Sequence, residues 1–138
     1  MDIQQAVNTS KAFSLAFDRC QERRPLADGH YEMLMVPAIT CLALAVEIGL
    51  KAIILRDGGT GRGHSLEKLV GMLSVNRRDT LLRAMGIEEA TFAPAISLVS
   101  DAFVEWRYIY ERDKAHVDLA FLSALNQAVQ TLIAAPQG

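Results

Sequence analysis

The chain has 138 residues, of which 51% are hydrophobic and 22% are charged, and its formal net charge is −2. This length fits a single domain spanning residues 1–138, with enough apolar content for a hydrophobic core. The near-neutral charge excludes a global basic field that would attract nucleic acid. Charge is uneven, however, since residues 51–83 hold seven basic and three acidic side chains. A local basic face and ordinary solvated helix surfaces both fit this excess.

The two cysteines, Cys20 and Cys41, lie inside apolar helical patterns and neither belongs to a CxxC motif. We expect them to be buried, reduced thiols. The first ten residues lack the positive region and apolar run of a signal peptide. These features predict a cytoplasmic protein with no membrane association.

The first predicted helix covers residues 3–23, where apolar residues recur at helical spacing. A loop follows at residues 26–30, with Asp28-Gly29 as its turn signal. The second predicted helix, residues 31–57, holds the most apolar stretch of the chain, residues 33–55. Its longest charge-free run, residues 33–46, is shorter than the roughly 20 residues that span a bilayer.

A helix that is apolar on nearly every side belongs at the centre of a bundle. We therefore expect residues 31–57 to form the central helix, with a bend near Pro37 because proline lacks a backbone donor. The glycine-rich segment 58–63 ends it. Ser65 is predicted to cap one short helix, and Asn76 to cap another that ends at Gly86.

Pro94 predicts the first turn of a long helix that reaches about residue 112, because proline is tolerated there. Its expected buried stripe includes Phe103, Arg107 and Tyr110. Asp118 is expected to cap the last helix, whose stripe consists of Leu122, Leu125, Val129 and Leu132.

No segment shows sustained strand alternation. The predicted fold is therefore all-α, an up-and-down helical bundle of four main helices plus one or two short ones. Because Trp106, Tyr108 and Tyr110 fall on different faces of one helix, apolar surface is left for a partner. We expect a two-fold homodimer formed by the last two main helices.

Two charged residues stand in apolar settings, Glu47 in the central helix and Arg107 in the stripe of the long helix. Each alone would be costly to bury. We expect the two to pair, with Lys51 one turn after Glu47 at the edge of the pair. A structural ion pair is the simpler interpretation, and a functional polar site is the alternative.

The glycine-rich segment leads to His64, and exposed backbone donors there are compatible with phosphate binding. It lacks the Lys-Ser/Thr of a P-loop, so a plain connector is the simpler interpretation, with His64 in a capping or packing role. The other histidines, His30 and His116, do not form a metal motif: Asp113 and His116 have i, i+3 spacing but no second such pair exists. We expect no metal and no cofactor.

Three stretches resemble the HEPN domain family, a family of small helical bundles: AVEIGLKAIIL at 45–55, GHSLEKLVGML at 63–73 and FVEWRYIYE at 103–111. The resemblance covers residues 31–134. The residues that carry it are Glu47, Leu50 and Lys51, then Gly63, His64 and Leu66, and finally Arg107, Tyr108, Tyr110 and Glu111.

This resemblance implies a biology linked to RNA. Many HEPN proteins are metal-independent ribonucleases of toxin–antitoxin or phage-defence systems, and others are non-catalytic RNA-binding or accessory modules. Active members carry an arginine followed, after four to six residues, by a histidine near the junction of the last two main helices. Here Arg112 and His116 lie at that junction, but only three residues separate them. Arg24 and His30 fit the interval at the wrong end of the chain.

The leading expectation is an RNA-associated or accessory HEPN-like protein, of a toxin–antitoxin or defence system, that binds RNA or an antitoxin protein without catalysis. Its candidate binding residues are Glu47, Lys51, His64, Arg107 and Tyr110. The first alternative is a metal-independent endoribonuclease that uses Arg112 and His116. The second alternative is a bundle that binds a small ligand or nucleotide.

Overall fold

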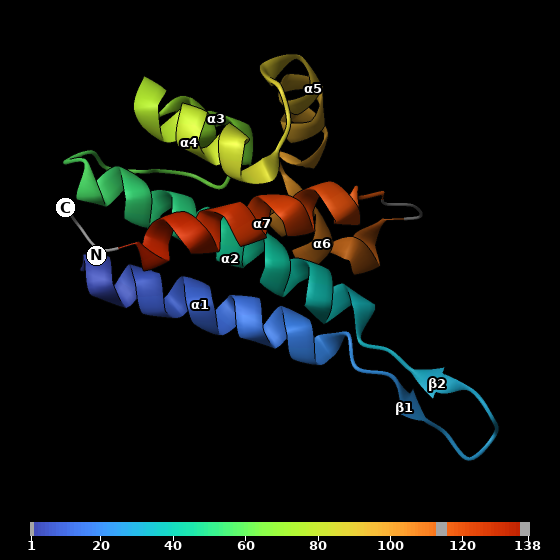
Figure 1. Cartoon of the computed structure of the whole chain (residues 1–138). Coiled ribbons are helices and arrows are strands. Elements are labelled where there is room, and N and C mark those ends of the chain that lie inside the picture. Colours follow the sequence, from blue (N-terminus) through green and yellow to red (C-terminus); the bar gives the residue numbers. More distant parts are fainter. Residues whose placement is uncertain (1, 113–115, 136–138) are drawn as a thin grey trace.

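The computed structural model describes residues 2–112 and 116–135. These residues form an all-α bundle with one small two-stranded hairpin, as predicted (Figure 1). The elements are α1 (Ile3–Cys20), β1 (Arg24–Pro25), β2 (Tyr31–Glu32), α2 (Met35–Arg56), α3 (Leu66–Gly71), α4 (Val75–Met85), α5 (Glu89–Val99), α6 (Ala102–Arg107), the 3-10 turn η1 (Ile109–Glu111) and α7 (Leu119–Ala134).

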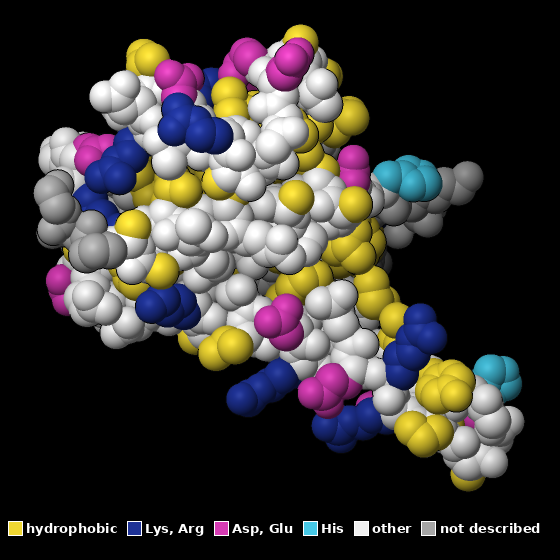
Figure 2. All heavy atoms as spheres, viewed as in Figure 1, with side chains coloured by type: hydrophobic (Ala, Val, Ile, Leu, Met, Phe, Trp, Pro, Cys, Tyr) yellow, Lys and Arg dark blue, Asp and Glu magenta, His cyan; other side chains and the backbone are white. Residues whose placement is uncertain are grey.

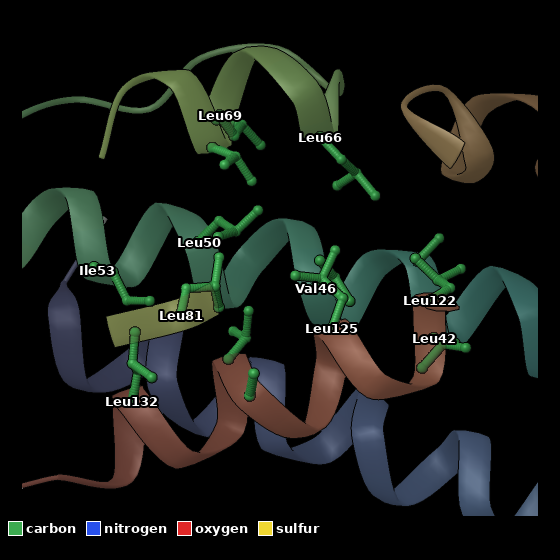
Figure 3. Packing of buried hydrophobic residues seen from close by; sticks show 14 of the residues in the cluster. Leu42, Val46, Leu50, Ile53, Leu66, Leu69, Leu81, Leu122, Leu125 and Leu132 are labelled. Carbon is green, nitrogen blue, oxygen red and sulfur yellow. The ribbon is translucent and has the colours of Figure 1, made fainter. Parts of the chain in front are cut away.

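Helix α2 is the centre of the bundle, and it contacts α1, α3, α6 and α7. Figure 3 shows its leucine and isoleucine side chains between those of α3 on one side and those of α7 on the other. Leu42, Val46 and Leu50 are all fully buried. The prediction of a central helix in this part of the chain is therefore confirmed, because a helix that is apolar on every side is stable only when other helices cover it.

Helices α1 and α2 lie unusually close together at Gly49. A Cβ atom there would lie 2.3 Å from Val129 Cγ1 of α7 and 2.9 Å from Ser10 Oγ of α1. The Ser10 hydroxyl donates to the backbone oxygen of Ala45 at 2.6 Å, and it accepts from Gln130 Nε2 at 2.8 Å. A glycine at position 49 is thus the reason that the three longest helices can meet at one point.

The start of α2 corrects two expectations, that the helix begins at residue 31 and that it bends near Pro37. The helix begins at Met35, so Pro37 lies in its first turn, where its missing N–H is not needed for a helical hydrogen bond, and no bend is required. By length and composition alone α2 is apolar enough to cross a membrane, but 67% of its most apolar window is buried inside the bundle. That burial is what a core helix shows.

The segment before α2 is a β-hairpin rather than a plain loop. Arg24 pairs with Glu32 and Pro25 with Tyr31, and Asp28-Gly29 forms the turn as predicted, with Gly29 at a φ of 88°. Figure 1 shows the hairpin projecting from the bundle. All of residues 21–34 are exposed. The hairpin therefore contributes no buried residue to the hydrophobic core.

Capping predictions were partly right. Ser65 caps α3 and Asp118 caps α7, each through its side-chain oxygen, and Gly86 ends α4 in a left-handed conformation. The cap of α4, however, is Ser74, whose side chain accepts from Arg77 N, so the prediction of Asn76 was wrong. A serine two residues earlier satisfies the free backbone donor of Arg77 and starts the helix sooner.

The prediction of one long helix after Pro94 was wrong, because this part of the chain forms three separate elements, α5, α6 and η1. Pro94 lies inside α5 rather than in its first turn. The break at Ser100-Asp101 is stabilised by tertiary contacts, since the Ser100 backbone oxygen accepts from Leu66 N and its hydroxyl lies 2.7 Å from Ser65 Oγ. This break shifts the phase of all later residues, so Phe103 is buried while Arg107 and Tyr110 are exposed.

Helix α7 follows its predicted stripe, and all four predicted positions are buried. Its C-terminal end is held by Arg56 of α2, which donates to the backbone oxygens of Leu132 at 3.2 Å and Ile133 at 2.6 Å. The last carbonyls of a helix have no partner within that helix. The Arg56 guanidinium supplies the hydrogen bonds that these two carbonyls lack. This contact joins the ends of α2 and α7.

Both cysteines are free and half-buried, so the expectation of reduced thiols agrees with the structure but full burial does not. Partial burial, and to a smaller extent the neighbouring Cys20, raise the pKa of the Cys41 thiol. A raised pKa keeps this thiol protonated and unreactive near neutral pH.

Candidate functional site

The candidate site is centred on Glu47, a carboxylate inside the most apolar helix of the chain. Its side chain is only 3% exposed. Oε2 lies 3.2 Å from Lys51 Nζ, one turn further along α2, and Oε1 lies 2.9 Å from His64 Nδ1. Both carboxylate oxygens therefore have a hydrogen-bond donor, which is what a buried charge requires.

The glycine-rich segment 58–63 brings His64 to this carboxylate. Gly58 and Gly63 have φ values of 85° and 83°, a conformation that favours glycine. Gly61 lies against the stem of Lys51, because a Cβ there would be 2.9 Å from Lys51 Cγ. The segment thus folds back along α2 and places His64 over Glu47.

Ser65 and Ser100 fix the other side of this arrangement. The Ser65 hydroxyl caps α3 by accepting from Lys68 N at 3.2 Å, and Ser100 Oγ accepts from Glu67 N at 3.2 Å. These contacts join the start of α3 to the break between α5 and α6. As a result, residues that are far apart in the sequence meet around His64.

A row of aromatic and basic side chains continues outward from His64. The His64 ring lies 5.5 Å from the Phe103 ring, and the Arg107 guanidinium lies 4.9 Å from Phe103 and 4.6 Å from Tyr108. The rings of Tyr108 and Tyr110 are 6.3 Å apart. We call Phe103, Arg107, Tyr108 and Tyr110 the aromatic–arginine row.

Exposure changes along this row. Phe103 is 9% exposed, Tyr108 is 40% exposed and Tyr110 is 76% exposed, and Arg107 also lies at the surface. A guanidinium stacked on rings is held in place while its N–H groups face solvent. The row therefore offers flat surfaces for stacking and a positive charge for a bound anion.

The predicted pairing of Glu47 with Arg107 is wrong. Within the described residues, no ion pair or hydrogen bond joins them, and the partners of Glu47 are Lys51 and His64. The break at residues 100–101 turns Arg107 outward, where the faces of two aromatic rings and water take the place of a counter-ion. Lys51, which was predicted at the edge of that pair, is instead a direct partner of Glu47, with its Nζ 3.2 Å from Oε2.

Of the five candidate binding residues, the structure groups Glu47, Lys51 and His64 directly, and links Arg107 and Tyr110 to them through Phe103. Phe103 and Ser100 were not predicted to be connecting residues. A signal for Phe103 does exist, since it lies four residues before Arg107 and that spacing places both side chains on one helical face.

Arg112 and His116, the candidate catalytic pair, are both exposed. Arg112 follows η1 in an extended conformation, and His116 precedes the cap of α7. In residues 2–112 and 116–135, neither side chain makes a hydrogen bond or an ion pair with another side chain. Asp113, part of the excluded metal motif, lies outside the described residues. Within the part of the chain that is described, no group of three metal-binding side chains occurs.

The Glu47–His64 contact has a defined chemistry. His64 Nδ1 lies 2.9 Å from Oε1, and a carboxylate oxygen accepts hydrogen bonds, so Nδ1 is the donor in this contact. Such a carboxylate orients a histidine, as it does in catalytic triads. Among the described residues no serine or cysteine side chain bonds to His64, so this structure provides no nucleophile beside it. The arrangement favours a positioning role for His64.

The face shown in Figure 2 carries no broad area of positive charge. Lys and Arg side chains there are interspersed with Asp and Glu side chains, and no continuous basic area covers it. Two ion pairs at the surface of the bundle join Arg77 to Asp57 and Arg78 to Glu89. On this face, an anion would be recognised by local contacts.

No family model, curated protein or solved structure matches this chain.

Proposed function

We propose that this protein is a HEPN-like, RNA-associated accessory protein that binds single-stranded RNA without cutting it. The observation that carries the proposal is the meeting of three separate stretches, the ones that resemble HEPN domains, around one place. Glu47 of the first stretch bonds His64 of the second, and His64 contacts Phe103 of the third. Three stretches that share one neighbourhood support one common role.

The aromatic–arginine row supplies the contacts for RNA. Single-stranded RNA is recognised chiefly by stacking of its bases on aromatic side chains and by cations that contact its phosphates. Tyr110 and Tyr108 present rings to solvent, and Arg107 presents its guanidinium beside them. Binding that rests on stacking is compatible with a net charge of −2.

The cysteine pattern, the aromatic residues and the family resemblance supply the remaining parts of the proposal. We propose that the protein acts in the cytoplasm, as a homodimer or bound to an antitoxin protein, within a toxin–antitoxin or phage-defence system. We place the dimer or the protein partner on the last two main helices, α5 and α7, outside the aromatic–arginine row that is proposed to bind RNA. Light scattering at micromolar concentration tests the dimer, and a monomer there would contradict it.

Fluorescence anisotropy with a labelled single-stranded oligonucleotide tests RNA binding. Replacing Tyr110 by alanine should weaken binding about fivefold or more, because one stacked base contributes roughly 1–3 kcal/mol. Arg83→Ala, which removes an exposed positive charge from α4, is the control and should bind as the wild type does. The two variants give the same dissociation constant if the row does not bind RNA.

The salt dependence provides a second measure of the same binding. Only a few cations lie near the row, so the logarithm of the affinity should fall with the logarithm of salt concentration at a slope of about −2, or roughly −0.7 for each phosphate contacted. A slope near −6 would instead indicate a broad basic surface, contrary to the interspersed charges described above. A protein with no measurable affinity at low salt would end the RNA-binding proposal.

A metal-independent ribonuclease is the second candidate function, favoured by the exposure of both Arg112 and His116 at the connection before α7. Histidine can transfer protons near neutral pH, and arginine can stabilise the charged phosphorane. If these residues act, His116→Ala and Arg112→Ala should abolish EDTA-resistant cleavage, whereas His64→Ala should matter less. Intact RNA after incubation with the wild-type protein would exclude this candidate.

A further inference from the structure

A small hollow lies between the end of α2 and the glycine-rich segment. Its volume is about 200 Å³, and Lys51, Leu55, Thr60, Gly61 and Arg62 line it. The Lys51 side chain is only 16% exposed, and its ammonium group lies 3.2 Å from Glu47 Oε2. The hollow is therefore a defined cavity of the fold and is separate from the aromatic–arginine row.

Hydrogen-bond donors without partners gather in this hollow. The ammonium group of Lys51 has three donors, and one of them is used by Glu47. Among the described residues, no acceptor bonds the Arg62 guanidinium, the Thr60 hydroxyl or the backbone N–H groups of Thr60, Gly61 and Arg62. Thr60 and Arg62 are exposed and line the hollow, so their donors are free to bond to an anion that enters it.

The charge of the lining has the same sign as these donors. Two of the five lining residues are cationic and none is acidic. Glu47, which bonds to Lys51, has both of its oxygens engaged, one by Lys51 and one by His64. An oxyanion in the hollow would therefore lie beside a lysine, an arginine and a threonine, and no acidic residue lines the hollow.

We propose that this hollow binds a phosphate group, presented either by a free nucleotide or by the phosphorylated end of an RNA strand. Phosphate oxygens accept several hydrogen bonds at once, and both lysine and arginine bind them well. Consecutive backbone N–H groups with nearby cations are a recurring means of holding anions in proteins. The inference does not depend on RNA binding by the aromatic–arginine row.

The proposal also gives Glu47 and His64 a further purpose. Glu47 holds Lys51 in place through Oε2, and His64 anchors the end of the glycine-rich segment through Oε1. Lys51 and the segment carry the donors of the hollow. The buried carboxylate thus positions both walls of the proposed site without lining it.

Amide NMR titration with inorganic phosphate tests the site directly. The backbone amide signals of Thr60, Gly61 and Arg62 should shift in a saturable manner, because these N–H groups would donate to the anion. Amides of α4 and α7 should not move. If the signals of residues 60–62 stay unchanged up to tens of millimolar phosphate, the proposal is overturned.

Two variants identify the side chains involved. Arg62→Ala, in an exposed segment that leaves the core intact, should weaken phosphate binding about tenfold or more, since hydrogen bonds to charged groups are the strong ones. Arg62→Lys should restore most of the affinity, and Arg83→Ala, the same loss of charge on α4, should leave it unchanged. Equal weakening by Arg62→Ala and Arg83→Ala would show only general charge attraction and would overturn the assignment.

The source of the phosphate is distinguished by parallel titrations with AMP, with a 5′-phosphorylated oligonucleotide and with the same oligonucleotide carrying a 5′-hydroxyl. Stronger binding of AMP than of either oligonucleotide identifies a nucleotide site, and a preference for the 5′-phosphorylated strand identifies an RNA-end site. In either case Arg62→Ala should remove the preference. Phosphate could shift the amide signals of residues 60–62 while Tyr110→Ala leaves RNA binding unchanged. That result would support phosphate binding in the hollow and contradict RNA binding by the aromatic–arginine row.

Discussion

Glu47 and Arg107 are both charged residues within apolar sequence patterns, yet their environments in the structure are opposite. Glu47 is buried, and both of its carboxylate oxygens bond to cationic or polar partners. Arg107 lies at the surface, where its guanidinium rests on Phe103 and Tyr108. A charge that must be buried acquires counter-charges and determines stability, whereas a stacked charge in water is left free to bind.

The largest effect expected from this difference is on folding stability. Glu47→Ala leaves Lys51 half-buried without its carboxylate, and removal of one member of a buried pair costs roughly 3–5 kcal/mol. Arg107→Ala, the matched change at the other end, should cost about 1 kcal/mol or less, because exposed cation–π contacts are weak. Urea unfolding of both variants measures the two costs. Equal losses would contradict the contrast between a buried and a stacked charge.

The second effect concerns packing next to Glu47. Gly49→Ala would place a Cβ atom 2.3 Å from Val129 Cγ1, and overpacking of this kind costs roughly 1–3 kcal/mol. Gly71→Ala is the control, since nothing lies within 4 Å of a Cβ at the end of α3. That variant should be neutral or slightly more stable, because alanine favours helix over glycine. Thermal unfolding of the two proteins separates tight packing from a general effect of the added methyl group.

The smallest effect is expected at an exposed ion pair, Asp57 with Arg77. The hydrogen bond from Arg77 holds the pKa of Asp57 below its ordinary value. A lowered folded-state pKa means that this pair stabilises the fold above the unfolded-state pKa, about 3.9. The contribution is lost as the pH falls through the folded-state pKa.

Asp57→Asn should therefore cost about 0.2–1 kcal/mol at pH 7, because solvent screens a pair that is more than one-third exposed. The difference from the wild type should vanish near pH 2. Urea unfolding at the two pH values measures it. If Asp57→Asn lowered the free energy of unfolding as much as Glu47→Ala does, burial would not explain the difference between the two ion pairs.

Much of the fold could be predicted because it follows from local pattern. The stripes of α2 and α7, the caps at Ser65 and Asp118 and the stop at Gly86 each depend on a few neighbouring residues. Helical spacing and capping depend on neighbouring residues, so they can be predicted from short stretches of the sequence.

The errors about Arg107 and the partners of Glu47 share one origin, which is contact between distant segments. The break at Ser100 depends on Leu66 and Ser65, residues that lie more than thirty positions earlier in the chain. No local pattern encodes that contact, and without the break Arg107 would fall on the buried stripe, as was predicted. The pairing of Glu47 with His64 depends likewise on how the glycine-rich segment returns along α2.

The RNA affinity of Arg107→Ala, Arg107→Lys and wild-type protein, measured at one low salt concentration, tests the central claim that the exposed charge serves binding. The account predicts that Arg107→Ala binds about tenfold more weakly or worse while remaining folded. Arg107→Lys should fall between the two, because lysine keeps the charge but not the flat stacking surface. Three equal dissociation constants would contradict the account.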